Sequence, residues 1–183
     1  MALSPITMLV GLMAAFFSWT STAQSLPSTG NQVITALGIV CLRYQDFTTQ
    51  VLALPSEPGS SEAQSFVDQF NQYIDSNVAG TAAFLENLPP PYSEVIQYAI
   101  QAVAYDDIRE NRRFLVAVVA KKNSFTKDQQ ETLSDLVSQQ RVIVEQYLNG
   151  TSVYAPEVQD IQEQLWGVFL EGVSSAVEAL ESQ

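Results

Sequence analysis

Hydrophobic residues recur every three or four positions along five stretches of the chain, which is the spacing of an amphipathic α-helix. The first stretch stops at Pro55, where the segment PSEPGSSE supplies a turn. Its apolar positions alternate steps of four and three: Val33, Leu37, Val40, Tyr44, Phe47, Val51 and Leu54. The pattern therefore predicts a first helix that buries one face.

The second and third helices are predicted on either side of the proline-rich segment LPPPY, residues 88–92. The second helix repeats the spacing from Phe66 to Leu88, with Gly80 as a weak point. The third starts near Ser93, and because residues 93–123 contain no Pro or Gly we expect one long helix. Its polar segment YDDIRENRR, residues 105–113, permits a bend. Its apolar side consists of Ile100, Ala104, Ile108, Leu115 and Val118.

The fourth and fifth helices carry start signals of their own. Thr126 and Gln129 have the spacing of a capping box, in which both side chains satisfy free backbone N–H groups. The fourth helix extends to about residue 148, and its inner face is predicted as Leu133, Val137, Gln140, Val144 and Tyr147. Pro156 suits the first turn of the fifth helix. That helix carries the stripe Val158, Ile161, Leu165, Val168 and Gly172, with Trp166, Phe169, Val173 and Val177 beside it.

No strand-like alternation competes with these five segments. The sequence therefore predicts an all-α fold, a single-domain bundle of about five amphipathic helices over residues 31–183. The short connections favour antiparallel neighbours, although helices of uneven length can also cross.

The N-terminal residues are read separately from this bundle. Residues 1–23 contain no charged side chain and have an apolar centre and small residues at the end, which indicates a secretory signal peptide cleaved before Gln24. A membrane anchor is the rival reading, but an apolar stretch of about a dozen residues is short for spanning a bilayer. Residues 24–30 are then expected to form a flexible N-terminus. The bundle that follows lacks a C-terminal hydrophobic tail of the kind a glycolipid anchor needs.

Composition excludes several classes of function. The net charge of −12 makes nucleic acid a poor partner. The chain has no histidine, which excludes His-based triads and His-ligated metal sites, and it has no Gly-rich phosphate loop. We therefore expect no metal and no cofactor. Cys41 is the single cysteine and is interpreted as a small buried hydrophobe rather than a reactive thiol.

The acidic residues of YDDIRENRR offer a candidate for catalysis and a simpler alternative. Asp106, Asp107 and Glu110 lie near several arginines, and acids and arginines at i,i+3 or i,i+4 spacing form ion pairs, so a solvated helix face explains them. A paired-carboxylate glycosidase site would use similar residues, but it needs a cleft and one raised pKa. The sequence therefore predicts a protein that is not an enzyme, with no catalytic residue.

Aromatic residues on or beside the inward stripes are the candidates for binding. In a helical bundle such residues usually form an ordinary core, but they can also line a cavity or an opening seam that takes apolar ligands. Periodicity does not separate the two readings. The candidate residues for binding lipid or hydrophobic material are Phe47, Phe70, Tyr73, Phe84, Phe114, Trp166 and Phe169.

Asn149 begins the sequon Asn149-Gly150-Thr151 in a segment expected to be an exposed loop. In an exported eukaryotic protein such a sequon is an acceptor for N-glycosylation. Asn149 is therefore a candidate glycosylation site.

Three segments of the second half, LVAVVAKKNSF, ETLSDLVSQQRVIVEQYL and VQDIQEQLWGVFLEGVSSAVEAL, resemble the fungal hydrophobic surface-binding protein A family, which includes cell-wall galactomannoproteins. The elements that match in order are Val119 to Lys122, the Phe that follows, and the Leu-Ser-Asp-Leu of residues 133–136. The resemblance is weaker before Ile96.

The resemblance implies a protein secreted to the extracellular space or the cell wall. Such a protein would adsorb to hydrophobic surfaces or bind fatty-acid and lipid chains between its helices, and it would bring a secreted esterase to such surfaces. The alternatives are a structural cell-wall mannoprotein without a ligand and, from another class, a hydrolase. A bound carboxylate would need a cation near it, and the candidates are Arg43, Arg109, Arg113 and Lys121. For Lys121 and Lys122 the residues themselves offer a simpler role, as cations beside the C-terminal carbonyls of the third helix.

Overall fold

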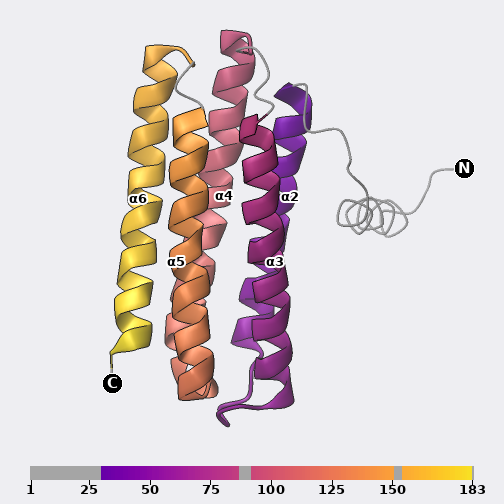
Figure 1. Cartoon of the computed structure of the whole chain (residues 1–183), viewed down its shortest axis with the longest axis vertical. Helices are drawn as coiled ribbons and strands as arrows, with labels where there is room; N and C mark the ends of the chain where they lie inside the picture. The colour runs from indigo at the N-terminus through magenta and orange to yellow at the C-terminus, as the bar shows by residue number, and fades with distance from the viewer. Residues whose placement is uncertain (1–29, 87–91, 151–153, 183) are drawn as a thin grey trace, which may run out of the picture.

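The computed structural model of the chain describes residues 30–86, 92–150 and 154–182, which form an all-α bundle (Figure 1). Within these residues the helices are α2 (Gly30–Leu52), α3 (Ser61–Glu86), α4 (Glu94–Ala120), the short 3₁₀ helix η1 (Lys122–Ser124), α5 (Lys127–Gly150) and α6 (Pro156–Glu181). The described residues contain no β-strand, so the predicted fold class is confirmed. None of the helices in this part of the chain is long and apolar enough to cross a membrane. The predicted signal peptide lies outside the described residues.

The five α-helices form two layers. Successive helices run in opposite directions, so α2, α4 and α6 are parallel to one another and antiparallel to α3 and α5 (Figure 1). Helix α4 contacts α2 on one side and α6 on the other, which makes one layer of three parallel helices. Helices α3 and α5 contact each other and form the second layer, and α5 also packs against α6. The inner face of α4 therefore points toward the middle of the bundle.

The inward stripes of α2, α4 and α5 follow the predicted spacing. In α2 the side chains of Tyr44, Phe47 and Val51 are buried, and in α4 so are those of Ile100 and Ala104. The polar middle of α4 does not interrupt it, because no Pro or Gly breaks the hydrogen-bonding pattern there. In α5 the buried positions include Leu133, Val137, Gln140 and Val144, as predicted.

The two connections at one end of the bundle are joined to each other. The capping box before α5 is confirmed, since the Thr126 N–H donates to Gln129 Oε1 at 2.9 Å and the Gln129 N–H donates to Thr126 Oγ1 at 3.3 Å. Gly59, in the turn between α2 and α3, has φ of +75° and donates its N–H to Ser124 O at 3.2 Å. These bonds fix the starts of α3 and α5 relative to each other.

Lys121 and Lys122 interact with helix ends, but not with the end that the sequence predicted. The Lys121 ammonium donates to Leu54 O, just past the end of α2, at 2.8 Å. The Lys122 ammonium donates to Ala179 O in the last turn of α6 at 2.8 Å, and to Ser182 O. Because α2, α4 and α6 are parallel, their C-terminal ends lie together, and two cations here offset the partial negative charge of neighbouring helices. The prediction that the lysines act on their own helix was therefore wrong.

Candidate functional site

Four of the aromatic residues predicted to bind apolar ligands belong to a packed cluster between α2, α3 and α4. The ring centroids of Phe70 and Phe114 are 5.0 Å apart, those of Phe47 and Tyr73 are 5.2 Å apart, and Phe47 and Phe70 are separated by 5.5 Å. Phe47, Phe70 and Phe114 are fully buried, and Tyr73 is partly buried against the same cluster. Edge-on and tilted contacts of this kind stabilise a core. An apolar ligand would reach these rings only if the helices separated.

Trp166 and Phe169 are buried on α6, a helix that contributes no ring to the first cluster. Their ring centroids are 5.8 Å apart, and Trp166 also packs edge-on against Tyr147 of α5 at 5.8 Å. The side chain of the seventh candidate, Phe84, lies outside the described residues. The prediction that these seven residues bind lipid stays a prediction, and their packing shows that they contribute to the core.

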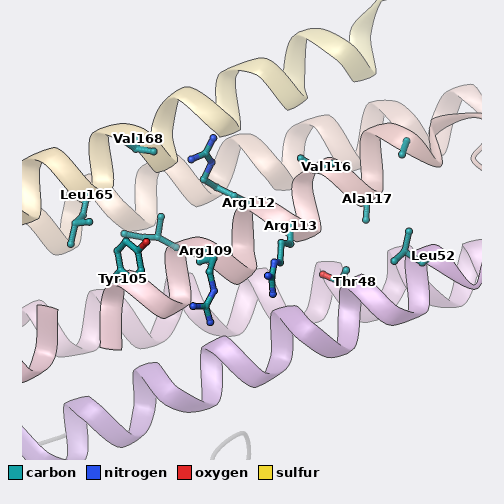
Figure 2. A pocket seen from close by; sticks show the side chains of 12 residues that line it. Thr48, Leu52, Tyr105, Arg109, Arg112, Arg113, Val116, Ala117, Leu165 and Val168 are labelled. Carbon is teal, nitrogen blue, oxygen red and sulfur yellow. The ribbon is translucent and has the colours of Figure 1, made fainter. Parts of the chain in front are cut away.

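A groove of about 680 Å³ lies on the opposite side of α4, along its outer face (Figure 2). Tyr105, Val116 and Ala120 of α4 form part of its floor, Leu52 of α2 forms part of one wall and Val168 of α6 part of the other. Large apolar side chains are unusually exposed here: Leu52 by 54%, Tyr105 by 55%, Val116 by 69% and Val168 by 43%. Exposed apolar side chains gathered in one groove make it the candidate site of interaction among the described residues.

Three arginines cross the middle of this groove. In Figure 2, Arg112 extends toward α6, whereas Arg109 and Arg113 extend toward α2. Arg109 pairs with Asp106 at 2.9 Å and with Glu110 at 3.0 Å, and Arg113 donates to both oxygens of Glu110 at 2.9 and 3.1 Å. Burial alone would raise the pKa of Glu110, but the hydrogen bonds from the arginines lower it below its ordinary value.

Arg112 is the groove arginine that forms no ion pair among the described residues. Its aliphatic stem crosses α6 at Gly172, where an added Cβ would lie 3.7 Å from Arg112 Cγ. Two carboxylates against three guanidinium groups leave the groove with one net positive charge on a chain whose net charge is −12. The groove is therefore both apolar and locally cationic.

The predicted stripe of α6 is only partly buried. Val158 is buried as predicted, but Ile161 and Val168 are exposed by 37% and 43%, and Leu165 and Val168 line the groove. The buried face is centred on residues that were predicted beside the stripe, and it consists of Val158, Gln162, Trp166, Phe169, Val173, Ala176 and Leu180. Helix α6 is apolar around most of its circumference, so spacing alone did not decide which stripe is buried.

Helix α4 has a partly inverted pattern in its first two-thirds. Its outer face carries exposed Val95, Tyr98 and Tyr105, whereas polar residues are buried on its inner face. The buried polar side chains of α4 are Gln97, Gln101, Asp107, Glu110 and Asn111. The prediction that YDDIRENRR is a solvated helix face was correct for Asp106 and Arg109 and wrong for Asp107 and Glu110, which are buried. Its predicted i,i+3 ion pairs are confirmed.

Asp107 is a buried carboxyl group whose pKa is shifted far from its ordinary value. Burial raises its pKa from 3.8 to about 8, and its Oδ1 atom has no hydrogen-bond partner among the described residues. The carboxyl group is therefore neutral in much of the physiological pH range. Its raised pKa meets one of the two conditions named above for an acid catalyst, but no second carboxylate pairs with it as a glycosidase requires.

Cys41 and Asn149, the two remaining sequence candidates, do not line the groove. Cys41 is a half-buried free thiol on α2, and burial raises the pKa of the thiol, which disfavours the reactive thiolate. Asn149 is exposed, but it belongs to the last turn of α5 rather than to a loop, and Thr151 of its sequon lies outside the described residues. No group of three His, Cys, Asp or Glu residues in the described part of the chain could hold a metal ion.

Comparisons with protein-family models, curated proteins and solved structures find no match to this chain. The resemblance to hydrophobic surface-binding proteins thus stays a prediction from the sequence segments given above.

Proposed function

We propose that the protein is a non-enzymatic module that binds apolar material through the groove on the outer face of α4. The observation that carries this proposal is the exposure of Leu52, Tyr105, Val116 and Val168 on three adjacent parallel helices. An exposed apolar surface favours aggregation, so its presence suggests a binding role. The net charge of −12 opposes association between copies of the chain.

The size of the groove favours an extended apolar surface over a single lipid chain. Full burial of a Leu or Val side chain gives about 1.5–3 kcal/mol, and these four side chains are about half exposed, so covering them gives roughly 4 kcal/mol. Association costs at least about that much, which leaves little affinity for one small molecule. A flat surface would also cover Val95 and Tyr98, which continue the apolar face along α4. Adsorption to a hydrophobic surface is therefore the favoured activity.

The setting of this activity rests on the sequence. The predicted signal peptide and the family resemblance support secretion to the extracellular space or the cell wall, and they support recruitment of a secreted esterase to the coated surface. Binding of fatty-acid or lipid chains at the buried aromatic rings is the second mode that the resemblance implies. It would be seen as lower retention of a fluorescent fatty acid by Phe70→Ala or Trp166→Ala while the helical spectrum persists.

The test of surface binding is adsorption of the purified protein to polystyrene and polyester beads. We expect Val116→Lys to lower the amount adsorbed about tenfold, because it replaces an apolar side chain that is 69% exposed with a further positive charge that must be desolvated beside the three arginines. Val142→Lys is the matched control, since Val142 is 47% exposed on α5 in the other layer. Circular dichroism checks that both variants fold. Equal losses in the two variants, or no adsorption by the wild type, would leave a structural wall mannoprotein as the better reading.

A further inference from the structure

A layer of polar residues crosses the middle of the bundle. Asp107 lies fourteen residues before Lys121 and Gln140 fourteen residues after Thr126, so both are about 21 Å from the turn between α4 and α5. Trp166 lies at a similar distance from the end of α6, which Lys122 holds beside that turn. Helices α4, α5 and α6 contribute to this polar layer, which extends over about 15 Å of α4. We define it as Gln101, Asp107, Asn111, Gln140 and Trp166.

Many polar atoms of this layer lack hydrogen-bond partners. Both carboxamide atoms of Gln101 and of Gln140 are buried and without a partner among the described residues, as are Asn111 Oδ1 and Trp166 Nε1. One turn before Gln101, by contrast, Gln97 donates to Tyr92 O at 2.6 Å and accepts from the Ala155 N–H at 2.9 Å. Unmet hydrogen bonds weaken a folded state, and water would satisfy them if the helices parted. The polar layer therefore contributes less to the stability of the bundle than a fully hydrogen-bonded or apolar layer would.

Asp107 is the titratable carboxyl group of this section, and no cation is among the groups on which its charge would act most directly. Its charge would act on Cys41 and Tyr44 of α2, Tyr73 of α3 and Tyr147 of α5, none of which is a cation. The residues that α6 contributes at this level, Gln162 and Trp166, are also uncharged. On α4 itself, the nearby cation Arg109 is occupied by Asp106 and Glu110 in the groove. On α2, Arg43 also acts on Tyr73, but it pairs with Asp46. An ionised Asp107 would therefore be stabilised by access to water.

We infer that the polar layer is a proton-controlled latch, which releases when Asp107 is ionised and lets the helices part beside Trp166 and Phe169. Parting would expose the buried rings on α6 that the sequence predicts as ligand contacts. The inference concerns regulation of apolar binding and so rests on the proposed function for its role, although the latch itself is tested without any ligand.

The direction of the pH effect follows from proton binding. The closed state holds the Asp107 proton up to a pKa of about 8, whereas a hydrated aspartate has a pKa of about 4. The open state thus binds fewer protons between these values, and the equilibrium constant for opening rises about tenfold per pH unit across that window. Below about pH 4 and above about pH 8 it does not change with pH.

Hydrogen exchange of backbone amides measures this opening directly. For amides of α4 near Gln101 we expect the protection factor to fall about tenfold per pH unit between pH 5 and pH 7 in the wild type. Asp107→Asn should abolish this dependence, because it removes the titrating group. Asp106→Asn is the matched control, since Asp106 is the neighbouring residue, is 52% exposed and pairs with Arg109. It should behave as the wild type does.

Three results would overturn the latch. One is a wild-type protection factor that does not vary with pH, which tests the latch even if a variant fails to fold. Another is the same pH dependence in Asp107→Asn as in the wild type. The third is equal protection near Gln101 and near Phe70 in the ring cluster, which would mean global unfolding instead of local opening. Adsorption to beads at pH 5 tests the proposed function separately, so either idea can fail without the other.

Discussion

Lys122 offers the most direct test of how the three parallel helices are held together. Its ammonium group bonds two carbonyl oxygens at the end of α6, those of Ala179 and Ser182. Hydrogen bonds to a charged group contribute about 1.5–3 kcal/mol, and the contact with the helix end adds a few tenths to about 1 kcal/mol. Because the group is partly exposed, solvent screening reduces this sum. We expect Lys122→Met to lower the free energy of unfolding by about 1–2 kcal/mol.

The assay is thermal or urea unfolding followed by circular dichroism at 222 nm. For a domain of this size, a loss of 1–2 kcal/mol lowers Tm by roughly 2–8 °C. Methionine keeps most of the aliphatic stem, so the loss reports on the ammonium group. Lys127→Met is the control, because Lys127 is exposed at the start of α5, and we expect it to change stability by less than about 0.5 kcal/mol. If Lys122→Met cost no more than Lys127→Met, the account of the helix ends would be refuted.

Two further substitutions test the turn and the ring cluster. Gly59→Ala should lower stability by about 1–3 kcal/mol in urea unfolding, since φ is +75° and the new Cβ would lie 2.7 Å from Thr126 Cγ2. Gly38→Ala, with nothing within 4 Å in mid-helix, should instead raise it by about 0.5–1 kcal/mol, and the same sign for both would contradict the analysis. Phe114→Ala should cost about 3–5 kcal/mol, whereas exposed Val116→Ala should change stability little; similar losses would refute the core assignment.

Local interactions explain why most of the helices could be predicted from the sequence. Helices α2 and α5 have few large apolar residues outside their inward stripes, so the spacing of the apolar residues specifies one buried face. The capping box of Thr126 and Gln129 depends on residues three positions apart, and it forms as predicted. Pro156 occupies the first turn of α6 as expected. Each of these features is decided within about one helical turn.

The orientation of α6 and the environment of Asp107 could not be predicted in this way. Two stripes of α6 are apolar, one with Val168 and one with Phe169, and which of them is buried depends on where α4 and α5 lie. Asp106 lies three residues before Arg109, pairs with it and is exposed, whereas the next residue, Asp107, is buried. A difference of one residue turns a side chain by about 100° around a helix, which is enough to move it from solvent to core.

The partners of Lys121 and Lys122 depend on topology instead of on neighbouring residues. Their carbonyl acceptors are 67 and 57 residues away in sequence. They meet because α2, α4 and α6 are parallel and end at the same level (Figure 1). Parallel helices in one layer concentrate like ends of their dipoles, which is unfavourable without compensating charge. The pair of lysines in an otherwise acidic chain is therefore explained by helix ends that the sequence alone does not bring together.

Helix α4 connects the two features on which our proposals depend. The groove lies on its outer face and the polar layer on its inner face, and between them Glu110 receives hydrogen bonds from Arg109 and Arg113. An apolar surface that covers the groove would remove water from these arginines and hold them more tightly to Glu110. Substitutions at Val116, in the groove, and at Asp107, in the polar layer, therefore test the two proposals separately on this one helix.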